Sequence, residues 1–202
     1  TTADKGDGGA GADTLGINDT TPVYAAINAF TGFEALGLFT TGATVDKANL
    51  TSINSFFVNT GSQTFTNTTN TSTFTLNNVA GLGTVAIGAA TGQTAVGITI
   101  DNGTATAAQT ITALTLTGLT GVTLVSNGTG VGGSNVITTF TNVENSNITL
   151  TGARDLTITN ALAGATTGSV FDANAFTGKL SLTGSGFNDI LTGGSAVDTL
   201  VG

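Results

Sequence analysis

Short runs in which apolar and hydroxyl residues alternate are the feature that most constrains the fold of this chain. Examples are LeuThrGlyLeuThrGlyValThrLeuVal at 116–125 and IleThrLeuThrGlyAlaArgAspLeuThrIleThr at 148–159. A period of two places successive side chains on opposite faces of a strand, so these runs predict strands with one face toward a core and one toward solvent. Because Gly, Asn or Asp follows each run, we also expect frequent tight turns.

The composition narrows the architecture to an all-β fold of an unusual kind. Charged residues make up 8% of the 202 residues, against roughly 25% in an average soluble domain. A β-sandwich usually carries more charged and aromatic side chains on its solvated faces, so it is the weaker alternative. Threonine facing solvent, aliphatic residues facing a narrow core and Asn or Gly at corners favour a parallel β-solenoid.

Three segments can be distinguished along the chain. Residues 1–20 and 184–202 are rich in glycine and aspartate, and residues 21–183 form a threonine-rich body. Pro22 marks a break before residues 23–39, whose mixed apolar pattern is compatible with a short helical turn. We therefore expect a solenoid body between two ends of different chemistry.

The ends carry a nonapeptide pattern, GGxGxDxUx, in which U is a large apolar residue. Residues 8–16, GlyGlyAlaGlyAlaAspThrLeuGly, fit it without a mismatch, with Asp13 at the acidic position. Asp4 stands nine residues before Asp13, and Asp189 and Asp198 are also nine residues apart. Departures from the pattern occur at Gly6, Ser185, Phe187 and Ala196, which predicts fewer and looser sites than an unbroken array would hold.

This pattern predicts calcium sites. Glycines allow tight bends in which carbonyl oxygens converge, and aspartate adds a hard anionic oxygen. Oxygen-only ligation favours calcium, and we expect an ion between stacked successive copies. Turns that bind no metal are the alternative. The predicted ligand residues are Asp4, Asp7, Gly9, Gly11, Asp13, Gly186, Asn188, Asp189, Gly194 and Asp198, of which Asp13, Asp189 and Asp198 are the strongest.

The terminal nonapeptides resemble the RTX calcium-binding repeats of bacterial proteins exported by type I secretion. The body is similar to repeat domains between RTX blocks in bacterial S-layer and other giant surface proteins, through residues 28–37, 148–159 and 170–184. The resemblance implies a β-solenoid or β-roll, calcium-dependent folding outside the cell, an uncleaved C-terminal export signal and assembly into a surface layer or filament. Because the sequence stops in mid-repeat, we expect one module of a longer polypeptide or its ordered part.

Charge and hydropathy argue against several partners. Twelve acidic residues face four basic ones, giving a net charge of −8, so no basic stripe is available for nucleic acid. No run of about 18 apolar residues occurs, which predicts that the chain does not span a membrane. We expect a homo-oligomer in a lattice or filament, calcium as the cation, an extracellular or cell-surface location and a cell-surface glycan as a candidate further partner.

Two GxGxxG patterns, at 6–11 and 128–133, invite a nucleotide-binding interpretation. The first is surrounded by Asp4, Asp7 and Asp13, which would repel a pyrophosphate. The second leads into a strand-like run, so no helix N-terminus would meet the phosphates. We therefore expect no nucleotide.

Catalysis is not expected. The chain has no His or Cys, so only carboxylates, hydroxyls and four basic groups are available as acids, bases or nucleophiles. Asp155 beside Arg154, with Asp172 or Glu144 on a neighbouring coil, is the cluster to inspect. The simpler interpretation is a solvated turn at Arg154 and Asp155, with exposed acids at the other two positions.

Rows of ThrXaaThr on a flat face could match an ice lattice, as in a module of a large RTX adhesin that binds a cell surface, ice or carbohydrate. That function would need coils of equal length, whereas the spacing here drifts, so threonine is more simply a strand former. The phenylalanines are predicted to be core or coil-end residues, with a carbohydrate-binding platform as the alternative; these are Phe56, Phe57, Phe65, Phe74, Phe140, Phe171 and Phe176.

Overall fold

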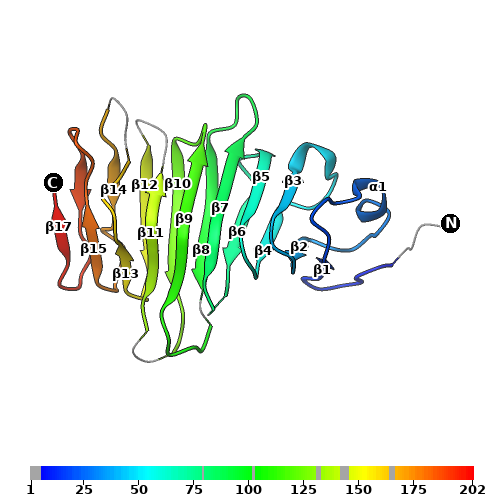
Figure 1. Ribbon diagram of the computed structural model, residues 1–202, viewed down its shortest axis with the longest axis horizontal. Coiled ribbons are helices and arrows are strands. Elements are labelled where there is room, and N and C mark those ends of the chain that lie inside the picture. The colour runs from blue at the N-terminus through cyan, green and yellow to red at the C-terminus, as the bar shows by residue number, and fades with distance from the viewer. Residues whose placement is uncertain (1–5, 79, 102, 131–132, 142–145, 164–166) are drawn as a thin grey trace.

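The computed structural model describes residues 6–202 except 79, 102, 131–132, 142–145 and 164–166. It is a parallel β-solenoid of two sheets whose strands stack along the long axis, with the N- and C-terminal coils at opposite ends (Figure 1). From β2 onward successive strands alternate between the sheets, and every pairing among the described strands is parallel. The solenoid prediction is confirmed, and the β-sandwich alternative is wrong.

In the part of the chain that the structure describes, one sheet has nine strands and the other has eight. The nine-stranded sheet contains, in spatial order, β1 (Thr14–Ile17), β2 (Ala35–Leu38), β4 (Ser55–Val58), β6 (Thr73–Leu76), β8 (Ala95–Asp101), β10 (Gly121–Asn127), β12 (Asn147–Gly152), β14 (Val170–Asp172) and β16 (Ile190–Thr192). The eight-stranded sheet contains β3 (Ala43–Asp46), β5 (Gln63–Thr68), β7 (Leu82–Ala89), β9 (Gln109–Thr117), β11 (Asn135–Thr141), β13 (Leu156–Ile158), β15 (Leu180–Thr183) and β17 (Thr199–Val201). Both Gly/Asp-rich ends therefore continue the same sheets as the body.

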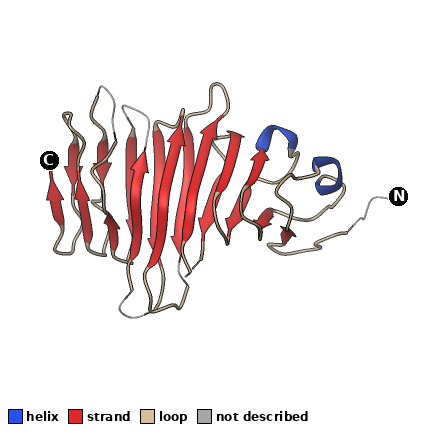
Figure 2. Cartoon of the chain, in the orientation of Figure 1, coloured by secondary structure: helices blue, strands red, loops and turns tan. Residues whose placement is uncertain are grey.

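Among the described residues, helical structure is confined to two short turns near the N-terminal end (Figure 2). Helix α1 (Tyr24–Ile27) lies in the segment predicted to hold a helical turn, between β1 and β2. The 3₁₀ turn η1 (Lys47–Asn49) begins after Asp46, whose side chain accepts a hydrogen bond of 3.0 Å from Ala48 N. In the N-terminal coil, α1 thus occupies the part of the chain where later coils place a strand of the eight-stranded sheet.

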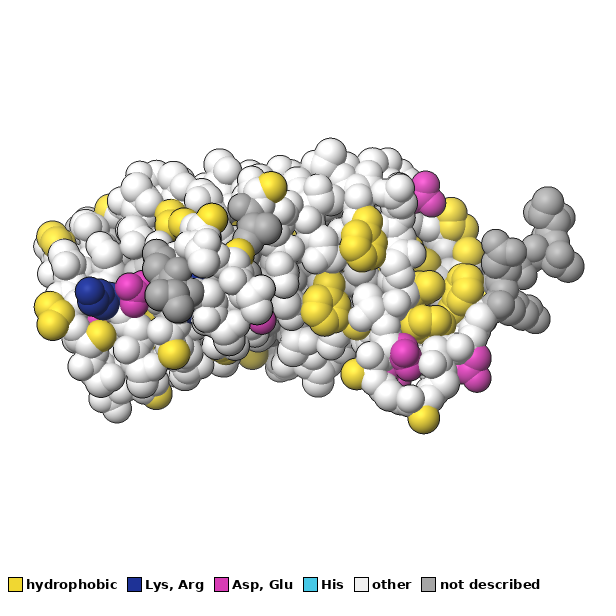
Figure 3. Space-filling model, turned by 90° about the horizontal axis from the view of Figure 1, so that it is seen from below, with side chains coloured by type: hydrophobic (Ala, Val, Ile, Leu, Met, Phe, Trp, Pro, Cys, Tyr) yellow, Lys and Arg dark blue, Asp and Glu magenta, His cyan; other side chains and the backbone are white. Residues whose placement is uncertain are grey.

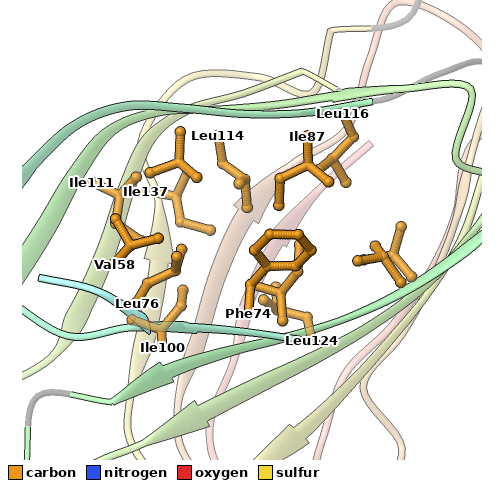
Figure 4. Close-up of a cluster of buried hydrophobic side chains, with 14 of the residues drawn as sticks. Val58, Phe74, Leu76, Ile87, Ile100, Ile111, Leu114, Leu116, Leu124 and Ile137 are labelled. Atoms are coloured by element: carbon orange, nitrogen blue, oxygen red, sulfur yellow. The ribbon is translucent and has the colours of Figure 1, made fainter. Parts of the chain in front are cut away.

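Strand alternation builds the core. Residues such as Phe74, Leu76 and Leu124 point between the sheets and are at most 1% exposed (Figure 4). Phe56, Phe65 and Phe74 form one aromatic cluster with ring centroids 4.7–5.2 Å apart. Phe140, Phe171 and Phe176 are also buried, as predicted, but Phe57 points outward and is only partly buried, because it follows Phe56 on the opposite face of β4.

The bends between the sheets form two columns at opposite edges of the solenoid. Edge 1 contains the bends that lead into the nine-stranded sheet, and edge 2 contains those that lead into the eight-stranded sheet. The bends absorb differences in coil length: Ser55 pairs with Thr73, 18 residues later, whereas Gly97 pairs with Thr123, 26 residues later. The strands therefore stay in register although the coils are unequal.

Candidate metal-binding bends

Three bends of the nonapeptide pattern precede terminal strands. The Gly8–Asp13 bend leads into β1, the Gly184–Asp189 bend into β16 and the Gly193–Asp198 bend into β17. In each bend the apolar residue two positions after the aspartate packs against the core; these residues are Leu15, Leu191 and Leu200. The fold therefore places the apolar residue of the pattern against the core at both ends of the solenoid.

The first glycine of each bend lies against the aspartate five positions later. A Cβ atom on Gly8 would lie 2.9 Å from Asp13 Cβ. A Cβ on Gly184 would lie 2.7 Å from Asp189 Oδ2, and one on Gly193 would lie 2.5 Å from Asp198 Oδ2. Such distances are shorter than real Cβ contacts, so the glycine is needed for the carboxylate to fold back over its own bend.

The two C-terminal aspartates use both carboxylate oxygens within the protein. Asp189 Oδ1 accepts a hydrogen bond of 2.7 Å from Ser169 N, and its Oδ2 accepts from Ser185 N and from Ser185 Oγ. Asp198 is bound in the same way, with Leu180 N donating to Oδ1 at 2.8 Å and Gly194 N to Oδ2 at 2.7 Å. Each carboxylate therefore joins its own bend to the preceding coil.

Asp13 differs from these two. Its Oδ2 atom is buried and has no hydrogen-bond partner within the described part of the chain. Gly9 and Gly11 have φ angles of +85° and +141°, a backbone form that the other two bends do not share, and Gly9 N donates to Asp7 rather than to Asp13, at 3.2 Å. The copy that matches the pattern fully is thus the one whose carboxylate has an oxygen without a partner.

The bend that stacks on Gly8–Asp13 contributes a further acid. Asp13 N donates a hydrogen bond of 2.9 Å to Glu34 Oε2, and Glu34 N donates to Asp13 O at 3.2 Å. Asp7 is bridged to Thr31 of the same neighbouring bend. Glu34 was not among the predicted ligands. The feature that could have identified it is its position immediately before β2, which matches the position of Asp13 immediately before β1.

The remaining predicted ligands are scattered. Gly186 and Asn188 are exposed residues of the Gly184–Asp189 bend. Gly194 donates its backbone N–H to the Asp198 carboxylate, and Asp4 lies outside the described residues. Asp189 is on edge 1 and Asp198 on edge 2, so these two copies, nine residues apart, do not stack on each other as expected, because a nonapeptide spans half a coil. Among the described residues, no three acidic side chains lie close enough to share a metal ion.

Arg154 corrects another prediction. It is 6% exposed, and its guanidinium donates to Gly130 O and, at 3.1 Å, to Ala105 O of the bends stacked below it on edge 2. The turn is therefore not solvated at this residue, because the backbone carbonyls of earlier bends converge on the cation. Asp155 accepts from Lys179 N at 2.8 Å, and Asp172 lies on the nine-stranded sheet, so the two do not form a cluster; Glu144 lies outside the described residues.

Both GxGxxG segments precede strands, at β1 and β11, rather than helices.

The outer face of the nine-stranded sheet carries a column of small and hydroxyl side chains, in which Thr123 pairs with Thr149 and Ser55 with Thr73. Gly97 interrupts the hydroxyls between Thr73 and Thr123. The side chains of this face therefore stay in register although the coils differ in length. The drifting spacing in the sequence had led us to expect that they would not.

In the described part of the chain, no helix has the length and hydropathy needed to cross a membrane. Comparison with models of protein families finds no matching family, and comparisons with curated proteins and with solved structures find no match. The class defined by the fold is a two-sheet parallel β-solenoid with glycine–aspartate bends at both ends.

Proposed function

We propose that this protein is a secreted, calcium-binding structural protein that self-assembles into a bacterial surface layer or extracellular filament. The resemblance of its ends to RTX repeats supports this function. The observation that carries the proposal is the Asp13 carboxylate, which has a buried oxygen without a partner in the bend that fits the nonapeptide fully. A buried anionic oxygen without a hydrogen bond is unfavourable unless a cation or a donor pairs with it.

The groups around this bend suit calcium. Asp13 and Glu34 are adjacent in stacked bends, and Asp7 lies in the same pair of bends. All of their ligand atoms are hard oxygens, which Ca²⁺ prefers, and backbone carbonyls can complete six to eight ligands. The ion would neutralise acids that otherwise repel one another. Residues Asp13 and Glu34 would hold it together with backbone carbonyls, and it would rigidify the bend that starts the solenoid.

Calcium linkage explains where the protein would order. Sites of roughly 10⁻⁴ to 10⁻³ M affinity are empty at cytosolic calcium and filled in millimolar extracellular calcium. Binding to the folded form alone adds its free energy to folding, so the N-terminal coil gains stability only outside the cell. No catalytic role is included in the proposal.

A calcium titration tests it. We expect calcium, but not an equal concentration of magnesium, to raise the thermal unfolding temperature and to increase the β signal in circular dichroism. Asp13→Asn should remove most of this response, whereas Asp172→Asn, a change at an acid on the sheet face, should keep it. Unchanged spectra and unfolding temperature up to about 10 mM calcium, ten times the weakest expected affinity, would contradict the proposal.

A second candidate function, a surface-binding module of an adhesin, is favoured by the hydroxyl column of the nine-stranded sheet. Neighbouring strands space these side chains by about 4.8 Å, which gives a flat and repetitive face suited to a crystalline or polysaccharide surface. Thr123→Tyr together with Thr149→Tyr would break this face without touching the bends. Loss of ice-recrystallisation inhibition or glycan binding in that variant would support the adhesin; absence of both activities in the wild type would exclude it.

A further inference from the structure

Three buried amide side chains open strands of the eight-stranded sheet at edge 2. Gln63, Gln109 and Asn135 are the first residues of β5, β9 and β11, and each is at most 1% exposed. On the face seen in Figure 3, most of the surface is neither hydrophobic nor charged, as expected for a chain rich in threonine, asparagine and glycine. Amides at the surface can bond to solvent, whereas these three must satisfy their polar groups inside the core.

Gln63 satisfies its polar groups within the protein. Its Oε1 atom accepts a hydrogen bond of 3.0 Å from Ala43 N, the residue directly across from it in the preceding coil. Its Nε2 atom donates to Thr60 O at 2.9 Å and also to Thr40 O. This side chain shows how an amide at the start of such a strand can join two coils.

Gln109 and Asn135 occupy the same position in their coils but are not paired in the same way. They lie directly across from each other in β9 and β11. Gln109 Nε2 donates to Leu76 O at 2.7 Å. Asn135 Nδ2 contacts three oxygens at 2.9–3.3 Å, which are Ile100 O, Ser126 Oγ and Asn127 O. The amide oxygens, Gln109 Oε1 and Asn135 Oδ1, are both buried and have no hydrogen-bond partner among the described residues.

The neighbours of the two amides fix their orientation. Turning the Gln109 amide over would place its oxygen beside Leu76 O, where two acceptors would repel each other. Turning the Asn135 amide over would place its oxygen against two carbonyls and against Ser126 Oγ, whose hydrogen is donated to Arg154 O at 2.8 Å. The groups that need a partner are therefore the two oxygens.

The backbone N–H that the Gln63 oxygen uses is already occupied at both other positions. The residue across from Asn135 is Gln109, whose N–H donates to Ser134 O at 3.1 Å. The residue across from Gln109, by extension of the β7–β9 register, is Ala80, whose N–H donates at 2.9 Å to a side chain two residues earlier. A donor for the two oxygens must therefore come from outside this backbone ladder.

We propose that one internal water molecule bridges the two coils by donating one hydrogen to Gln109 Oε1 and the other to Asn135 Oδ1. Two oxygens one strand spacing apart, about 4.8 Å, can both lie about 2.8 Å from a single water at an angle close to tetrahedral. Ser126 provides the room, because it continues the inward column of Leu76 and Ile100 with a smaller side chain (Figure 4). Buried waters ordinarily bind at polar sites of this kind.

The chemistry of this corner favours water over a metal ion. None of the side chains that bond to the two amides is a carboxylate. The guanidinium of Arg154 bonds to Ala105 O and Gly130 O, in the bends that lead into β9 and β11, so a positive charge already lies in these bends. A second buried cation without a carboxylate would be strongly unfavourable. The site is also separate from the Gly8–Asp13 bend, which lies on edge 1.

A crystal structure of the whole chain, grown in EGTA with rubidium chloride as the salt, tests the site directly. We expect a density peak within about 3 Å of both Gln109 Oε1 and Asn135 Oδ1 that refines as water and gives no anomalous rubidium signal. A rubidium peak at this position would show that the ligand is a cation and would overturn the water. Absence of density between the oxygens, or a protein donor to each of them, would overturn the site.

A double-mutant cycle tests the bridge in solution. Gln109→Met and Asn135→Leu each remove one acceptor while keeping a similar volume, and each should lower the urea midpoint of unfolding in EGTA. Because the same water serves both oxygens, the double variant should lose clearly less than the sum of the two single losses. Gln63→Met combined with Gln109→Met is the control, in which the losses should add. Additive losses in both pairs would contradict a shared water.

Discussion

Asp198 Oδ1 accepts a hydrogen bond of 2.8 Å from the backbone N–H of Leu180, the residue directly across from it in the preceding coil. The Asp189 carboxylate contacts Ser169 in the same way on the other edge. These carboxylates act as connectors between coils, whereas Asp13 keeps an oxygen without a partner. The three aspartates of one repeat pattern therefore divide into structural acceptors and a candidate ligand.

This division predicts opposite effects of amide substitution. Asp198→Asn should lower the free energy of unfolding in EGTA by about 1–3 kcal/mol, because its amide group cannot accept from both Leu180 N and Gly194 N. Asp13→Asn should leave the stability in EGTA unchanged or slightly raised, since a buried unpaired charge is removed. Urea denaturation in EGTA measures both. Equal destabilisation by the two variants would contradict the division between Asp198 as a structural acceptor and Asp13 as a candidate ligand.

The first glycine of a bend should be sensitive to a methyl group. Gly184→Ala places a Cβ 2.7 Å from Asp189 Oδ2, and we expect a loss of about 1–3 kcal/mol of stability from the resulting displacement. Gly186→Ala is the matched control in the same bend, because a Cβ there has no neighbour within 4 Å. Thermal unfolding compares the pair, and a loss at Gly186 as large as that at Gly184 would contradict the bend geometry.

Arg154 should behave as a structural clamp. Arg154→Ala leaves the part-buried carbonyls of Ala105 and Gly130 without the guanidinium donor, and hydrogen bonds to a charged group contribute about 1.5–3 kcal/mol each. Arg154→Lys should restore less than half of the loss, because one ammonium group lacks the planar fork of guanidinium. Hydrogen exchange should show faster opening of the edge 2 bends in both variants. Full rescue by lysine would mean that charge alone matters at this position.

The phenylalanine cluster offers a test of the core. Phe74→Ala removes a ring that contacts Phe56 and Phe65 with centroids 5.1 and 4.7 Å away, and it should cost about 3–5 kcal/mol. Phe57→Ala is the control, because this neighbouring ring points outward and is only partly buried. We expect a change below about 1 kcal/mol there. Chemical denaturation monitored by circular dichroism measures both variants.

The solenoid was predictable because alternation of apolar and hydroxyl residues is a local property that every strand repeats. The burial pattern of β8, in which Val96, Ile98 and Ile100 point inward, follows directly from it. The register was not predictable, since bends of unequal length hide which residues pair. Neither was the edge on which each aspartate lies, because that depends on counting strands between two sheets.

The candidate site was predictable in type but not in detail. The nonapeptide marks Asp13, but Glu34 stands 21 positions later, and its carboxylate reaches Asp13 only once the chain between them is folded into one coil. Burial of Arg154 was missed because its carbonyl acceptors come from bends 24 and 49 residues earlier. Contacts of that span depend on stacking, for which the sequence carries no local signal.

The unequal coils also affect the dimensions of the molecule. Each coil advances the stack by one strand spacing, about 4.8 Å, whether it contains 18 residues or 26. Extra residues therefore widen the profile at an edge without lengthening the rod. A peptide inserted into such a bend would be displayed at the side of the solenoid, while the spacing between its coils stayed the same.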